Sequence, residues 1–334
     1  MVKAVLAMAV LAGVGDARGE YVGVSADGWT LLSIGIRTVK VGNPGNSPDR
    51  RYTPAGRGSV PYTYHMGMHE VTWGQYAIFL NAIARADPYG LYDPQMAGII
   101  DQIGGIGSHT YDLDEEWRDR PVCYVSWGDA ARFCNWLTNG GPEIGLCDRS
   151  STEDGSYLLE GAVGWDELMA VSRKSTALYA IPTDDEWYKA AFYDGELGVY
   201  HDYATRGSAP PSNDLQVPDT GNSANFRDDH GYCLGGPPWY TKVGQFGNSQ
   251  SPYGTFDQAG NASEWTEAVV CGARGRNGGC YASGLGTLHA SSIDNANPDG
   301  GGWLIGFRVV EVPEPASCAL LAVGGLALLR RRRG

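Results

Sequence analysis

Three short amphipathic segments that begin with the same kind of N-terminal cap constrain the fold of this chain more than any other feature. At each of them, a hydroxyl side chain stands three residues before a side chain that can reach back to the cap amide, which is the pattern of a capping box. The three pairs are Thr72 with Gln75, Ser126 with Asp129, and Thr183 with Glu186. Apolar residues recur on one helical face behind the first two caps, and Trp187 lies on such a face behind the third. We therefore expect three one-sided helices that pack against a core.

The rest of the chain favours short strands joined by irregular loops. With 48 glycines and 18 prolines among 334 residues, long regular elements are interrupted often. Residues 62–72 and 303–312 alternate or run apolar as strands do, and residues 155–164 have the pattern of a hairpin. The sequence therefore predicts an α+β fold with little regular secondary structure, in a single large domain over residues 35–311.

Both ends of the sequence have the pattern of sorting signals. Lys3 precedes an apolar run over residues 4–14 and then small residues, which is typical of a secretory signal peptide, here residues 1–17. Near the other end, a Val-Pro-Glu-Pro sequence is followed by the apolar residues 316–329 and then four arginines. This apolar run is shorter than the roughly 20 residues that a spanning helix needs. We expect an exported protein of the periplasm or cell surface.

The order of these three C-terminal parts resembles the PEP-CTERM tail of exported bacterial proteins, here residues 312–334. The resemblance implies that the tail contacts the membrane transiently and that a membrane protease of the exosortase type removes it. Such a protease is therefore one expected partner of the chain.

Charge and cysteine content limit the other partners. The formal net charge is −13, so the chain repels phosphate backbones and nucleic acid is not expected to bind, whereas a divalent cation is compatible with this charge. Six of the seven cysteines precede the tail, and an oxidising compartment permits them to form disulfides whose pairing the sequence does not fix. Their spacing does not match a zinc site.

Five motifs in a fixed order carry a resemblance to a known family. They are MGMHEVTWGQYAIFLNA (66–82), PVCYVSWGDAARFCNWL (121–137), YAIPTDDEWYKAAFYD (179–194), SPYGTFDQAGNASEWTE (251–267) and GFRVV (306–310). Together they resemble the formylglycine-generating enzymes, the sulfatase-modifying factors. The resemblance implies a single domain of the C-type-lectin-like type, poor in regular secondary structure.

The fourth motif contains the residues of a candidate calcium site. Asp257 and Glu264 offer carboxylate oxygens, and Gly260 and Ala262 offer backbone carbonyls across a tight loop, a ligand set that suits Ca²⁺. The matching positions bind calcium in the family that the chain resembles. The alternative is that Asp257 caps a turn and Glu264 pairs with an arginine.

A second calcium site is implied by the resemblance at residues 223–229. Its candidate ligands are the Asn225 side chain and the Phe226 carbonyl, with Asp229 as a further candidate. The sequence that follows departs from the family's aspartate-glycine-aromatic arrangement.

The copper site of the family is the point at which this chain differs most. The resemblance implies that two cysteines after a Gly-Gly pair bind Cu(I), which requires soft sulfur ligands. Here Ser283 and Leu288 occupy the two cysteine positions, and Cys280 occupies a serine position. Copper is therefore not expected, and the catalytic candidates that are left are Cys280 and Ser283.

Three alternatives remain open for Cys280: a disulfide with Cys271, a buried free thiol, or a reactive site. The resemblance also places Cys134 where the family often has a bridging cysteine, but the usual partner position is Val309. Cys134 therefore pairs elsewhere, for example with Cys147, or stays reduced in the core.

His65 and His69 precede Glu70 in a pattern that would suit a metal if it lay on a helix. It lies instead in an expected strand, where residues at even spacing share one face. No third ligand is evident, so we interpret both histidines as structural or surface residues.

Two functions follow from these observations. The first is a non-catalytic, calcium-stabilised surface module that binds an extracellular polysaccharide or an exported protein, because the thiolate pair is missing and the 10 tryptophans and 19 tyrosines can stack on sugars. The alternative is a metal-dependent oxidoreductase that converts a cysteine of exported sulfatases to formylglycine.

Overall fold

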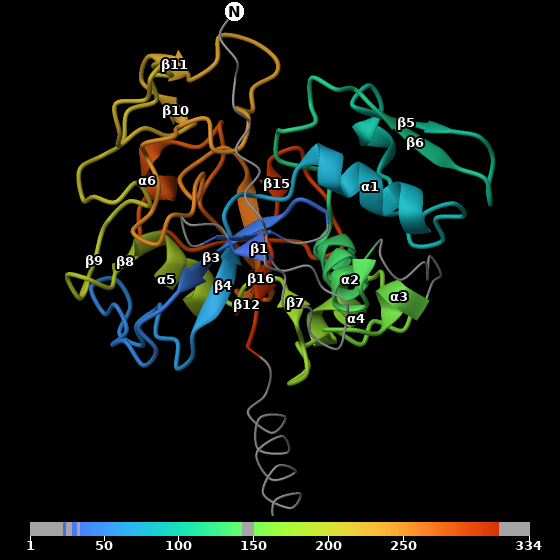
Figure 1. Ribbon diagram of the computed structural model, residues 1–334, viewed down its shortest axis with the longest axis horizontal. Coiled ribbons are helices and arrows are strands. Elements are labelled where there is room, and N and C mark those ends of the chain that lie inside the picture. The colour runs from blue at the N-terminus through green and yellow to red at the C-terminus, as the bar shows by residue number, and fades with distance from the viewer. Residues whose placement is uncertain (1–22, 25–28, 32–33, 142–149, 314–334) are drawn as a thin grey trace, which may run out of the picture.

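The computed structural model describes residues 23–24, 29–31, 34–141 and 150–313 (Figure 1). Its central feature is a six-stranded antiparallel sheet with the strand order β1-β2-β3-β4-β16-β7. The strands are β1 (Gly23–Val24), β2 (Trp29–Leu31), β3 (Arg37–Val41), β4 (Tyr64–Gly67), β16 (Val310–Glu311) and β7 (Tyr179–Ala180). Strands from both halves of the chain therefore meet in one sheet, as expected of a single domain.

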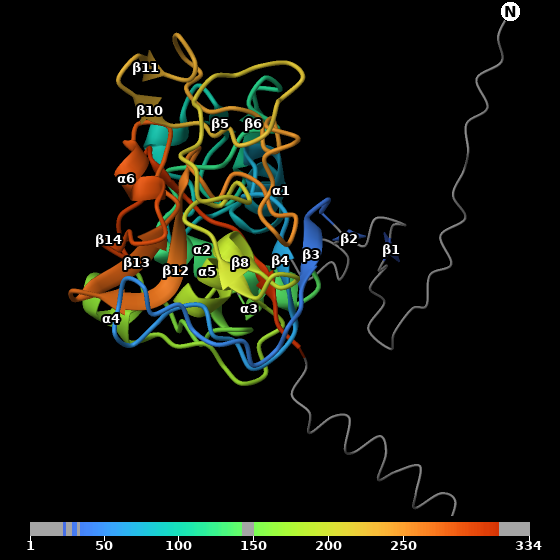
Figure 2. The same ribbon diagram turned by 90° about the vertical axis from the view of Figure 1, so that its left-hand side faces the viewer.

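A second sheet of four strands has the order β14-β13-β12-β15, in which β15 is parallel to β12. Its strands are β12 (Ser263–Val270), β13 (Ala273–Asn277), β14 (Asp294–Ala296) and β15 (Ile305–Gly306). Figure 2 shows this sheet on the opposite side of the molecule from β3 and β4. The fourth sequence motif ends on β12, so its last residues are held by the ladder of this sheet.

Three two-stranded hairpins complete the strands of the described residues. They are β5 (Ile100–Ile103) with β6 (Thr110–Leu113), β8 (Tyr193–Asp194) with β9 (Val199–Tyr200), and β10 (Arg227–Asp228) with β11 (Gly231–Tyr232). Their strands are two to four residues long. This confirms the expected low content of regular structure.

The three capped helices form as predicted. They are α1 (Trp73–Ile83), α2 (Trp127–Thr138) and α5 (Asp184–Phe192), and each has both hydrogen bonds of its capping box. Figure 1 shows α1 and α2 to the right of the central strands and α5 to the left. The shorter helices are α3 (Ser150–Glu153), α4 (Trp165–Ala170), α6 (Leu285–Leu288) and the 3₁₀ turn Pro94–Met96. No helix in the described ranges is long and apolar enough to cross a membrane.

The core has two parts. The larger part includes the fully buried Trp265 and a cluster of aromatic rings in which Phe133 contacts Phe79 and Phe307 at centroid distances of 5.2 and 5.3 Å. The smaller part surrounds α5 and includes Trp187 and Leu288. The predictions that Trp187 and Trp265 are core residues are confirmed.

The hairpin predicted over residues 155–164 does not form. This segment has only isolated bridges, and α4 follows it directly. The reason is a long-range contact: the Asn135 side chain donates to the Tyr157 carbonyl at 3.0 Å and accepts from the Tyr157 amide at 2.8 Å. Because this side chain of α2 takes both backbone groups of Tyr157, no partner strand is needed there.

Candidate functional site

The loop that follows β13 contains Gly279, which lies next to Ser283 and Leu288, the two residues that the resemblance puts at the cysteine positions. Gly279 has a φ of 69°, and a Cβ atom there would lie 3.0 Å from Leu288 Cδ1 and 3.2 Å from Ser283 Cβ. Both side chains therefore flank the same glycine, one from the loop and one from the end of α6.

The groups that actually occupy this place do not form a soft metal site. Ser283 Oγ accepts a hydrogen bond from the Cys280 amide at 3.0 Å and lies 3.3 Å from Cys280 Sγ. Leu288 is almost fully buried in the smaller part of the core. The site therefore offers one thiol, one hydroxyl and a hydrocarbon side chain, and only the thiol is a good ligand for Cu(I).

The structure distinguishes among the alternatives for the cysteines. Cys280 is a buried free thiol, and Cys271 is free and exposed, so the Cys271–Cys280 disulfide does not form. Cys134 is also a free thiol and is fully buried, and Val309, at the usual partner position, is a buried side chain without sulfur. The possible partner Cys147 lies outside the described residues.

Glu264, a candidate calcium ligand, forms a buried ion pair instead. Its carboxylate accepts from Arg308 Nε at 2.5 Å and from Arg308 Nη2 at 2.6 Å, and both side chains have no exposed surface. The Trp187 indole donates to the same carboxylate at 2.7 Å. Both Glu264 oxygens are thus engaged, and the guanidinium group supplies the positive charge that a calcium ion would supply.

The other three residues of the candidate calcium site have different neighbours. Asp257 has a φ of 61° and accepts from the Gly244 amide at 2.6 Å, which is the turn-capping role of the alternative interpretation. The Gly260 amide is bonded to the Gly278 carbonyl, and the Ala262 amide lies 3.4 Å from a Glu70 oxygen. As arranged, this set does not fit a calcium ion held through Glu264.

Three carboxyl groups share this interior region with a single arginine. Burial raises the pKa of Glu70 well above its ordinary value, and the charges of Asp257 and Glu264 add to the effect. Burial also raises the pKa of Asp257 to about 6. Glu70 Oε2 is buried without a hydrogen-bond partner among the described residues, so no donor stabilises a negative charge at this oxygen.

The second candidate calcium site is divided between two networks. Asn225 donates to the Trp239 carbonyl and to Asn261 Oδ1, both at 3.0 Å, while its own Oδ1 is buried and has no partner in the described structure. The Phe226 carbonyl accepts from the Asn213 side chain at 3.3 Å. Groups of three or more His, Cys, Asp or Glu side chains placed to hold a metal do not occur in the ranges that the structure describes. These contacts do not test calcium binding, which stays a prediction.

The two histidines of the third metal pattern lie in different surroundings. His65, in β4, lies 3.7 Å from a Glu311 oxygen on the neighbouring strand β16. His69 lies beyond the end of β4 and its ring is 5.4 Å from that of Phe256. The structure does not bring them to one site.

A chain of aromatic side chains includes Tyr281, the residue that follows Cys280. We call it the aromatic row, and it consists of Tyr232, Trp239, Tyr281, Tyr240, Trp303 and Tyr124, in that order of contact. Successive ring centroids are 4.8 to 6.1 Å apart, and the Trp239 and Tyr281 rings are parallel to within 8°. Tyr232 is exposed, Trp239, Trp303 and Tyr124 are half-buried, and Tyr281 and Tyr240 are buried.

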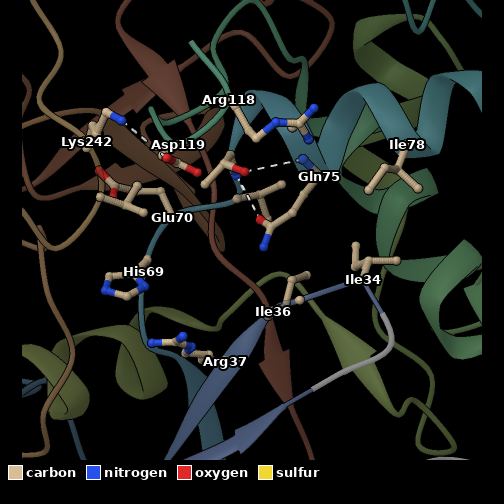
Figure 3. Close-up of a pocket in the computed structure, with 15 residues that line it drawn as sticks. Ile34, Ile36, Arg37, His69, Glu70, Gln75, Ile78, Arg118, Asp119 and Lys242 are labelled. Atoms are coloured by element: carbon tan, nitrogen blue, oxygen red, sulfur yellow. Dashed lines mark hydrogen bonds and ion pairs between the residues drawn. The ribbon is translucent and has the colours of Figure 1, made fainter. Parts of the chain in front are cut away.

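A cavity of about 430 Å³ lies between the β3 strand and the start of α1 (Figure 3). Arg37, His69, Arg118, Asp119 and Lys242 contribute polar groups to its wall. The apolar part of the wall comes from isoleucines and valines, which are Ile34, Ile36, Val71, Ile78 and Val243. None of its lining residues belongs to the Cys280 loop.

Sequence reasoning missed both the row and the cavity, because each is assembled from separate segments. The cavity combines residues 34–37, 69–78, 118–119 and 242–243, and only the second of these segments belongs to a motif. The only sequence signal was the high number of aromatic residues, which does not say which of them meet.

Comparison with known proteins identifies relatives of the fold. The sequence model described as "Sulfatase-modifying factor enzyme 1-like domain" matches residues 27–312. No curated protein matches the chain. Similar solved structures are CarF, with 21% identity, a TM-score of 0.49, and coverage of 84% of this chain and 99% of CarF; and PvdO of Pseudomonas aeruginosa, with 15% identity, a TM-score of 0.48, and coverage of 84% and 96%. Treponema denticola variable protein 1 is also similar, with 16% identity, a TM-score of 0.43, and coverage of 83% and 95%.

Proposed function

Because the chain belongs to the family of sulfatase-modifying factor enzyme 1-like domains, we propose that it is an exported member that binds a surface ligand and does not generate formylglycine. The observation that carries the proposal is the pair of side chains at Gly279. Ser283 and Leu288, which the resemblance puts at the two cysteine positions, both flank Gly279, and neither side chain carries a thiolate. Since neither of these two positions supplies sulfur, Cys280 lacks the thiolate partner that a Cu(I) pair at this loop would need.

A Cu(I) titration tests the first half of this proposal. Competition with a chromophoric Cu(I) chelator should show no tight copper binding by the wild-type chain, whereas the variant with both Ser283→Cys and Leu288→Cys should bind about one Cu(I) per chain. Copper bound tightly by the wild type and released in Cys280→Ser would support the alternative function, a metal-dependent oxidoreductase acting on a sulfatase cysteine.

For the second half of the proposal, the ligand is a polysaccharide and the binding surface is the aromatic row. Aromatic faces pack well on the C–H faces of sugar rings, and the row has exposed or half-buried rings at both of its ends. The Arg227 guanidinium lies 5.7 Å from the centre of the Tyr232 ring, at the exposed end of the row. Hydroxyl and amide groups of a neutral polysaccharide also avoid the repulsion that the net charge of −13 imposes on anionic polymers.

A glycan array, followed by native gels that contain extracellular polysaccharide of the producing cells, tests this surface. We expect Trp239→Ala and Tyr232→Ala to reduce the retardation by about tenfold each. Tyr52→Ala is the matched control, because Tyr52 is similarly exposed and its ring contacts His289, which is not a member of the row. Equal retardation of all variants, or no retardation of the wild type, would exclude polysaccharide binding by the row.

Export and processing are part of the same proposal. Residues 1–17 and, except for residues 312 and 313, the PEP-CTERM-like tail lie outside the described residues, so the support for export is the sequence pattern alone. Intact-mass measurement of the chain recovered from its own cells is the test. A mass that lacks both terminal segments is expected, and a full-length mass in the cytoplasm would contradict the proposal.

A further inference from the structure

We propose that a second cavity, beside the first turn of α2, is a binding site for a primary ammonium group carried by a small molecule. Its volume of about 220 Å³ lies below the range for drug-sized ligands, so the site suits a small amine. Pro94, Val163 and Leu168 give its wall apolar surface for the carbon body of such a ligand. The inference does not depend on the polysaccharide proposal, since the cavity shares only Tyr124 with the aromatic row.

Three carboxylates in the wall of the cavity favour a cation. They belong to Asp93, before the 3₁₀ turn, to Asp129, in α2, and to Asp299, in the loop before β15. None of the three forms an ion pair within the described part of the chain. Their charges are therefore available to a ligand that enters the cavity. Acidic groups close enough together to hold a metal ion do not occur among the described residues, so the cation is a molecule.

Asp129 is the most buried of these acids and has an oxygen to offer. Only 7% of its surface is exposed. Its Oδ2 atom accepts from the Ser126 amide at 2.9 Å and from the Ser126 hydroxyl at 2.6 Å, whereas its Oδ1 atom has no hydrogen-bond partner among the described residues. Burial raises the pKa of Asp129 to about 6, so the carboxylate is still ionised at neutral pH. The free oxygen can therefore accept a charge-assisted hydrogen bond from an ammonium group.

The cation among the lining residues, Arg132, is already neutralised. Its guanidinium donates to Glu153 from Nε at 2.8 Å and from Nη2 at 3.2 Å, and Nη2 also donates to the Ala162 carbonyl at 2.9 Å. Glu153 itself does not line the cavity. The Arg132 charge is thus balanced by an acid from outside the wall, and the wall keeps the charge of its three aspartates.

The first turn of α2 does not make the cavity an anion site. A helix N-terminus favours anions because its first amides are unpaired and carry partial positive charge. Here the Trp127 amide donates to the Pro298 carbonyl at 3.0 Å, and the Asp129 amide donates to the Ser126 hydroxyl at 3.1 Å. The Asp129 carboxylate already supplies the negative charge that this end of the helix favours.

Tyrosine rings give the cavity a further means of attracting a cation. Tyr89, Tyr92 and Tyr124 line it and are half-buried, and the face of such a ring attracts an ammonium group. The Arg132 guanidinium lies 4.2 Å from the centre of the Tyr89 ring, so Tyr92 and Tyr124 are the rings left for a ligand. Tyr124 has a φ of 60°, which bulky residues rarely adopt, and a Cβ at Gly301 would lie 2.4 Å from its carbonyl carbon. This close backbone contact fixes Tyr124 in the wall before a ligand arrives.

Titration of the full chain with three matched probes tests the proposal: butan-1-amine, butan-1-ol and butanoate, followed by calorimetry or ligand-observed NMR. At about pH 7.5, where the amine and the carboxylates are ionised, the amine should bind at least about tenfold more tightly than the alcohol. Butanoate should bind most weakly. Equal affinity for the amine and the alcohol, or preference for butanoate, would overturn the proposal.

A second pair of probes, glucosamine and glucose, identifies the carrier of the ammonium group. Tighter binding of glucosamine than of both glucose and butan-1-amine would support an amino sugar as the carrier. Tighter binding of butan-1-amine would support an alkyl amine. These probes are monomers, so their result is separate from the retardation by polysaccharide that tests the aromatic row.

Variants locate the binding. Replacing two of the acids (Asp93→Asn with Asp299→Asn) should weaken binding of butan-1-amine about tenfold or more and leave butan-1-ol unchanged. This variant is expected to fold, because Asp299 is exposed and an asparagine at position 93 can still accept from the Gln95 amide. The control is Glu196→Gln with Asp214→Asn, which changes the net charge equally at two exposed residues outside the cavity. Loss of amine binding in the control, or its retention in the first variant, would overturn the assignment to this cavity.

Discussion

The buried ion pair between Arg308 and Glu264 gives the most quantitative prediction. In Arg308→Met, Glu264 loses two hydrogen bonds of 2.5 and 2.6 Å and keeps only that from the Trp187 indole. The carbonyls of Gly67 and Phe256 lose their bonds to the same guanidinium, each of 2.9 Å. The substitution therefore leaves a buried carboxylate without its counter-charge.

The expected loss of stability is large. Removal of one partner of a buried ion pair costs about 3–5 kcal/mol, and each unpaired carbonyl adds about 1 kcal/mol. Arg308→Met should thus lower the free energy of unfolding by about 4 kcal/mol or more. Replacing both partners (Arg308→Met with Glu264→Met) removes the unpaired charge, so it should cost less than the sum of the single substitutions by about 2 kcal/mol.

Urea denaturation followed by circular dichroism, with all four members of the double-mutant cycle, is the assay. A loss below about 1 kcal/mol in Arg308→Met, or strict additivity of the two single substitutions, would refute the inferred pairing. It would also reopen Glu264 as a calcium ligand, because its oxygens would then be free. The matched measurement is urea denaturation of the wild type with and without added calcium.

Two further predictions concern α2 and the loop before Cys280. Burial raises the pKa of Asp129 from the ordinary 3.8 to about 6, so its contribution to stability is fully present below about pH 4 and is lost as the pH rises through about pH 6. In thermal unfolding at a series of pH values, Asp129→Asn should lack this loss of stability between about pH 4 and pH 6. A variant with the same pH profile as the wild type would contradict the prediction. Gly278→Ala should destabilise the chain by about 2 kcal/mol in urea, since its φ is 89° and its Cβ would lie 3.1 Å from the Gln258 carbonyl. The control Gly272→Ala has a similar φ of 83° but open space around the Cβ, so a loss as large as that of Gly278→Ala would argue against the steric contact.

The parts of the fold that depend on neighbours in sequence were predictable. The capping boxes and apolar faces of α1, α2 and α5 are set within a few residues, and all three helices formed where the sequence placed them. The hairpin at residues 155–164 was wrong because the competing partner, Asn135, lies about twenty residues away on α2. Strand pairs such as β4 with β16 join distant parts of the chain, and no local pattern fixes them.

The same distinction holds for the candidate sites. The resemblance put Ser283 and Leu288 at the two cysteine positions, and in the structure both side chains lie next to Gly279. Spacing alone left two roles open for Glu264. It does not reveal that Arg308, in the segment between β15 and β16, donates to the Glu264 carboxylate. The aromatic row and the cavity depend on contacts across several loops, so sequence periodicity gave no signal for them.

The measurement that tests the account most directly is mass spectrometry of a cysteine-containing sulfatase-motif peptide after incubation with the purified chain, Cu(I) and oxygen. An active formylglycine-generating enzyme serves as the control. We predict that the peptide keeps its cysteine with this chain while the control converts it. Conversion of the cysteine to formylglycine by this chain would contradict the assignment of Ser283 and Leu288 to the two cysteine positions and establish the chain as an oxidoreductase.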